Sequence, residues 1–72
     1  MKLDYFAETD SLYIDLSDLP SVESREISDG VILDYDANGN LVGIDIDNAS
    51  SKVELEELIL RNLPSRVETL PA

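Results

Sequence analysis

Apolar and polar residues alternate along the first part of the chain, which is the pattern of half-buried β-strands. Residues 1–6 and 11–16 both show it, with apolar side chains at Met1, Leu3, Tyr5, Leu12, Ile14 and Leu16. A four-residue turn over 7–10 sets Tyr5 opposite Leu12 and Leu3 opposite Ile14. Because the turn length and the apolar faces agree, we expect an antiparallel hairpin with this register.

A second hairpin is predicted over residues 30–46, where two apolar runs flank the dipeptide Asn38-Gly39. Asn-Gly tolerates positive φ at both central positions of a type I′ turn. A two-residue turn pairs apolar residues on one face: Tyr35 with Val42, Leu33 with Ile44, and Val31 with Ile46. A longer loop keeps the same faces but sets Tyr35 against Asn40, so we favour the two-residue turn.

The chain between the hairpins is less regular. Residues 17–20 are predicted to form a loop, because Ser and Asp compete for backbone hydrogen bonds and Pro20 cannot donate one. A further strand is predicted over residues 21–27. Its apolar residues Val22 and Ile27 lie on opposite faces, so the pattern leaves open which side is buried.

After Asn48 the apolar spacing becomes helical. Ser51 and Glu54 fit a capping box, and Pro64 follows an apolar stripe at Leu55, Leu58, Ile59 and Leu63. We therefore predict an α+β fold, an antiparallel β-meander of about five strands with one C-terminal helix packed on one face. The expected domain spans residues 1–64, and residues 65–72 are expected to form a mobile tail.

Composition removes several classes of function. The 72 residues contain no cysteine and no histidine, which excludes disulfides, Cys/His zinc sites and histidine acid/base catalysis. The net charge of −11 repels phosphate backbones and opposes direct nucleic-acid binding. No signal peptide or membrane-length apolar run is visible. We expect a cytoplasmic protein that is not an enzyme, uses no cofactor and makes no membrane contact.

The second hairpin also resembles a calcium-binding loop. Asp34, Asp36, Asn38 and Gly39 match positions 1, 3, 5 and 6 of an EF-hand loop. Position 12 is Asp45 in place of the bidentate Glu, and the flanking segments are strands rather than helices. A ligand- or calcium-binding domain using the acidic hairpin 34–45 is therefore the alternative hypothesis, and turn chemistry is the favoured explanation of Asn38-Gly39.

The opposite face of the predicted sheet carries a cluster of acidic and aromatic side chains. Its carboxylates are Asp4, Asp15, Asp34 and Asp45. A solvated face explains such alternation more simply than catalysis does, since no nucleophile or pocket is evident. The interspersed apolar residues favour a protein contact, either a homodimer or a heteromer. The candidate interaction face comprises Phe6, Tyr13, Ile32, Asp34, Leu41 and Asp45.

Several segments together resemble a known family: residues 10–14, 23–26, 29–36, 41–46 with Gly39, and the pair Ala49-Ser50. Over residues 2–50 the sequence resembles the small prokaryotic family named domain of unknown function 2283. The resemblance implies a compact β-meander followed by a helix, and no established activity.

Members of this family are often encoded beside small toxin-like proteins, which implies an antitoxin-like or accessory role. An acidic domain could mask a small basic partner by electrostatic complementarity. We therefore predict a small acidic protein-interaction domain.

Overall fold

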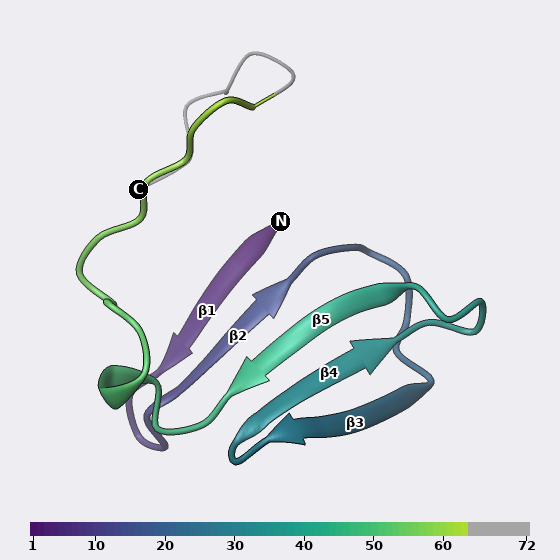
Figure 1. Ribbon diagram of the computed structural model, residues 1–72, viewed down its shortest axis with the longest axis horizontal. Coiled ribbons are helices and arrows are strands. Elements are labelled where there is room, and N and C mark those ends of the chain that lie inside the picture. The colour runs from purple at the N-terminus through teal and green to yellow at the C-terminus, as the bar shows by residue number, and fades with distance from the viewer. Residues whose placement is uncertain (64–72) are drawn as a thin grey trace.

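The protein forms one five-stranded antiparallel sheet in the computed structural model, which describes residues 1–63 (Figure 1). The strands are β1 (Lys2–Phe6), β2 (Ser11–Asp15), β3 (Glu23–Ser28), β4 (Val31–Tyr35) and β5 (Leu41–Ile46), followed by the single-turn 3-10 helix η1 (Ala49–Ser51). The predicted tail, residues 65–72, lies outside the described residues. No helix within residues 1–63 is long and apolar enough to cross a membrane.

The strand order in the sheet is β1-β2-β5-β4-β3, so the predicted meander is wrong (Figure 1). Consecutive strands pair within β1–β2 and within β3–β4–β5, as in a meander. After β2, however, residues 16–22 carry the chain to the far edge of the sheet, and β5 returns to lie between β4 and β2. The β2–β5 ladder therefore joins two local units.

The predicted register of the first hairpin is confirmed, because Leu3 pairs with Ile14 and Tyr5 with Leu12. In the second hairpin, the predicted pairing of residues holds along the strands but not next to the turn. Val31 pairs with Ile46 and Leu33 with Ile44, but Tyr35 pairs with Leu41 and not with Val42. A β-bulge between Asp34 and Tyr35 accounts for the shift.

The two-residue type I′ turn is also wrong. Asp36 N–H donates to the Asn40 carbonyl (2.9 Å), and Gly39 N–H donates to the Asp36 carbonyl (3.1 Å). Gly39 has φ 82°, whereas Asn38 is not among the residues with positive φ. These features describe a three-residue loop, a type I turn followed by a left-handed glycine. The Asp36 carboxylate stabilises it by accepting from Asn38 N–H (2.9 Å) and Asn40 N–H (2.8 Å).

The predicted C-terminal helix is wrong: within residues 1–63 only η1 is helical, and no helix packs on the sheet. The capping box does not form, because Ser51 Oγ donates to the Asn48 carbonyl. A helix of about 12 residues is marginal without tertiary packing. Glu54 and Glu57 would also lie side by side on it with like charges. The apolar spacing indicated a helix that these local interactions do not stabilise.

The third strand lies at the edge of the sheet, and its outlying apolar residues are not buried. Val22 and Ile27 are 64% and 60% exposed, and a β-bulge between Glu26 and Ser28 interrupts the ladder to β4. Arg25 shares the face of Leu33, where its guanidinium lies 5.2 Å from the centre of the Tyr35 ring. The sequence left open whether the side of Val22 or that of Ile27 is buried, and in the structure neither residue is buried.

The sheet has one apolar face and very little core. The apolar face, as the term is used below, comprises Leu3, Tyr5, Leu12, Ile14, Val31, Leu33, Tyr35, Ile44 and Ile46. Among the described apolar residues only Leu12, Val42 and Ala49 are buried, and no large side chain is fully enclosed. The side chains at the centre of this face are half-buried.

Candidate functional site: two faces of one sheet

Cross-strand pairing gathers most of the predicted interaction residues into two rows on the side of the sheet opposite the apolar face. We call this side the outer face. One row is Asp4, Tyr13, Asp45, Ile32 and Glu26, and the next is Lys2, Asp15, Gly43, Asp34 and Ser24. Phe6 ends β1 and pairs with Ser11. Leu41 does not join the rows, because the bulge sets it in register with Tyr35.

Tyr13 lies across Gly43 and links three strands of the outer face. A Cβ atom at Gly43 would overlap the Tyr13 hydroxyl and lie 2.7 Å from its Cζ, so the ring occupies the space that a side chain would fill. The Tyr13 hydroxyl donates to Asp34 Oδ2 (2.9 Å), and Ser24 Oγ donates to Asp34 Oδ1 (2.6 Å). The Asp34 carboxylate on β4 thereby joins side chains from β2 and β3. Sequence reasoning missed this contact, although a glycine inside a strand often marks a close approach.

Negative charge accumulates on the outer face. Its rows carry the acids Asp4, Asp15, Glu26, Asp34 and Asp45, and one cation, Lys2. Burial, followed by the charges of Asp47 and Asp34, raises the pKa of Asp45 above its ordinary value. The hydrogen bond to Asp34, then burial and the nearby carboxylates, raises the pKa of Tyr13 to about 12. Each shift disfavours the ionised form of the group concerned.

The Tyr13 shift predicts a loss of stability at high pH. A hydroxyl whose pKa is about 12 when folded and about 10 when unfolded stabilises the fold fully below pH 10. That contribution is lost as the pH rises from about 10 to about 12, and it amounts to at most about 2–3 kcal/mol. Urea unfolding at several pH values tests this, with ultraviolet absorbance of tyrosinate as the direct readout. In Asp34→Asn, Tyr13 should ionise at lower pH; an unchanged titration would contradict the assignment.

The hairpin geometry divides the four calcium candidates: Asp34 and Asp45 lie in adjacent rows of the outer face, and Asp36 and Asn38 lie in the loop. Both Asp34 oxygens accept side-chain hydrogen bonds on the outer face. The Asp36 carboxylate instead closes its own loop, and the hydrogen bonds that it accepts, led by that from Asn40 N–H, lower its pKa. Asn38 is exposed in the loop, and Asp45 lies on β5. No group of three or more acidic side chains within residues 1–63 is placed to hold a metal ion. Calcium binding stays a prediction that none of these contacts supports.

A model of the family described as "Protein of unknown function (DUF2283)" matches residues 2–50. The chain belongs to the DUF2283 family. The predicted resemblance is thereby confirmed over the same residues, which include all five strands. The chain is also 34% identical over 64 residues to the uncharacterised protein MJ0789 of Methanocaldococcus jannaschii. That alignment covers 88% of this chain and 54% of the relative, so the chain spans about half its length. No solved structure matches the chain.

The DUF2283 region ends at a contact between the β1–β2 turn and the residues that follow β5. Asp10, with φ 52°, occupies a left-handed position in the turn before β2. Its carboxylate accepts from Ser50 N–H (3.1 Å), Ser50 Oγ (2.7 Å) and the Tyr5 hydroxyl (2.7 Å), and these bonds lower its pKa. Ala49 N–H donates to the Asp10 carbonyl (2.8 Å). The segment that matches the family model therefore includes both sides of this contact, Asp10 and the pair Ala49-Ser50.

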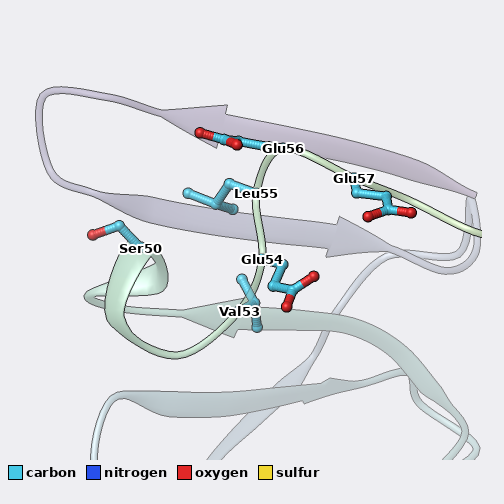
Figure 2. A pocket seen from close by; sticks show the side chains of 6 residues that line it. All are labelled: Ser50, Val53, Glu54, Leu55, Glu56 and Glu57. Atoms are coloured by element: carbon cyan, nitrogen blue, oxygen red, sulfur yellow. The ribbon is translucent and has the colours of Figure 1, made fainter.

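After the contact between Asp10 and Ser50, residues 53–58 run beside the β1 side of the DUF2283 sheet (Figures 1 and 2). They form a groove of about 530 Å³ with one end of the apolar face, lined there by Leu3, Tyr5, Leu12, Ile14 and Ile46. Figure 2 shows Val53 and Leu55 beside three glutamates in this stretch. Sequence reasoning did not foresee the groove, because it placed a helix here. The rest of the apolar face, centred on Leu33 and Ile44, lies outside the groove lining.

Proposed function

We propose that this DUF2283 protein is a protein-interaction domain that binds a small basic protein through its outer face, in an antitoxin-like or accessory role. The observation that carries the proposal is the excess of acids over cations in the two rows of the outer face. A basic surface laid on these rows would neutralise charges that repel one another, which favours fast and selective association.

The contacts within the outer face support a preformed binding surface. Tyr13, Asp34 and Ser24 are held by hydrogen bonds across strands, so little side-chain freedom is lost on binding. Burial, followed by the charges of Asp47 and Asp34, raises the pKa of Asp45. The ion pair between Arg25 and Glu23 (3.2 Å) lies on the apolar face and neutralises none of these acids. A partner's lysine or arginine side chains would supply the missing counter-charge.

A pull-down with the immobilised full chain tests the proposal. It should recover a small basic protein. The affinity should fall roughly tenfold or more when added salt shortens the Debye length below the distances between opposite charges across the interface. The variant Asp4→Asn/Asp15→Asn/Asp45→Asn should weaken binding by about tenfold or more, because it removes outer-face charge and keeps the Tyr13–Asp34 bond. Quantitative binding at several salt concentrations provides the measurement.

The matched control is Glu54→Gln/Glu56→Gln/Glu57→Gln, which removes the same number of charges away from the outer face. It should weaken binding much less. Equal weakening by the two triple variants would show that net charge alone drives association. Recovery of nothing except further copies of this chain would also overturn the proposal.

A further inference from the structure

The groove between residues 53–58 and one end of the apolar face has two walls of different chemistry. The sheet supplies apolar and aromatic side chains, and the opposite wall mixes apolar side chains with Glu54, Glu56 and Glu57 (Figure 2). We infer that this groove binds a short extended segment of another protein in which apolar and basic residues alternate. The groove lies on the side of the sheet opposite the outer face, so the inference does not depend on the proposed function.

The groove offers apolar surface that a bound segment would bury. Leu3, Tyr5 and Leu58 line it and are 41%, 46% and 55% exposed. Its volume of about 530 Å³ lies within the range of roughly 300–1,000 Å³ that is usual for ligand-binding clefts. Because removing apolar surface from water is favourable, we expect apolar side chains of the bound segment to face the sheet.

The three glutamates of the groove form no ion pair within residues 1–63. Lys52, the nearest cation along the chain, donates instead to the carbonyls of Asp29 (2.9 Å) and Asp47 (2.7 Å). Residues 64–72 contain one arginine and one glutamate, so they add no net positive charge. Basic side chains of another protein would supply the counter-charge, which is the complementarity that selects this occupant.

The arrangement of the glutamates favours several cations on one chain over a single ion. Acidic side chains within residues 1–63 do not converge in groups of three on a metal position. Residues 54–57 span at most about 11 Å. Alternate residues of an extended segment lie about 6.6–6.8 Å apart on the same side, so two basic side chains fit along this stretch. The residues between them point the opposite way, and the alternation therefore matches the two walls.

Fluorescence anisotropy with the full chain tests the inference. The probe is a labelled peptide of about eight residues that alternates leucine and lysine, and it should bind with a dissociation constant of roughly 1–100 μM, since the contact is smaller than that between folded domains. A peptide with serine in place of leucine should bind at least about tenfold more weakly. Failure of the alternating peptide to bind, as when the chain's own residues fill the groove, would overturn the inference, and so would equal binding of the serine peptide.

Two triple variants separate the groove from the outer face. Glu54→Gln/Glu56→Gln/Glu57→Gln should weaken binding of the alternating peptide by about tenfold or more. Asp4→Asn/Asp15→Asn/Asp45→Asn removes the same number of charges from the outer face and should change it by less than about twofold. Equal weakening would show that net charge alone attracts the peptide. Each variant is the control for the other surface, so failure of the groove leaves the outer-face proposal standing.

Methyl signals of the wild-type protein give a second measurement that needs no variant. Ile14 and Leu58 line the groove, whereas Ile32 lies in the outer face. Adding the alternating peptide should shift the methyl signals of Ile14 and Leu58 and leave those of Ile32 in place. Shifts at Ile32 with none at Ile14 would place the peptide on the outer face and contradict the inference.

Discussion

Replacing Gly43 with valine is expected to lower the free energy of unfolding by about 2–4 kcal/mol. The new Cβ would overlap the Tyr13 hydroxyl and ring, so the ring would have to leave its position. Its hydrogen bond to the Asp34 carboxylate, of a class that contributes about 1.5–3 kcal/mol, would be lost. Displacing a packed ring costs about 1–3 kcal/mol more, and the β-propensity of valine offsets up to about 1 kcal/mol. Urea unfolding followed by circular dichroism provides the measurement.

The control for this prediction is the same substitution in a Tyr13→Ala background. Without the ring, Gly43→Val meets no overlap and should cost less than about 0.5 kcal/mol, or should stabilise the strand. The difference between the two backgrounds is the coupling energy between residues 13 and 43. An equal cost in both would show that the valine acts through the backbone and not through Tyr13.

Replacing Leu12 with alanine is expected to lower the free energy of unfolding by about 2–3 kcal/mol, near the lower end for buried leucines. Leu12 is 8% exposed and lies between Tyr5 and Ile46 on the apolar face, so its removal leaves a cavity in the best-covered part of the sheet. The open groove beside it lets neighbouring side chains relax, which places the expected cost below the maximum. Unfolding curves at one fixed protein concentration measure the difference.

Leu19→Ala provides the matched comparison, because the same atoms are removed from a loop leucine that is 54% exposed. Its expected cost is below about 0.5 kcal/mol. If the two variants were equally stable, the coverage of Leu12 by the strands and residues 53–58 would contribute nothing to folding, contrary to the burial described above.

The sequence predicted the strands well, because a period of two assigns each residue to a face and the turn lengths then set the register. This is why Leu3 meets Ile14 as expected. Leu33 also meets Ile44, although the turn between their strands is longer than predicted, because the β-bulge takes up the extra residue. The position of β5 between β2 and β4 was not predictable in this way, since alternation says nothing about which hairpins pair with each other. The turn differed because the Asp36 side chain binds two backbone N–H groups of the loop.

For the candidate site, too, the sequence predicted the face on which a residue lies but not the contacts that depend on the strand order. Alternation placed Tyr13, Asp34 and Asp45 on one face, and the structure has them in adjacent rows. It could not show that Tyr13 crosses Gly43 to reach Asp34, because that diagonal contact depends on β5 lying between their strands. The helix prediction failed for a related reason, since the spacing of Leu55, Leu58 and Ile59 describes an apolar stripe but not whether a surface stabilises it.

The strand order also bears on when the chain can fold as it leaves the ribosome. The β1–β2 hairpin is complete at Asp15 and the β3–β4 hairpin at Tyr35, yet these two units share no ladder. Their connection is β5, which pairs Leu12 with Ile46 on one side and Val31 with Ile46 on the other. A nascent chain that ends before β5 therefore consists of two separate hairpins, each marginal in water. The sheet becomes continuous only when synthesis has passed Ile46.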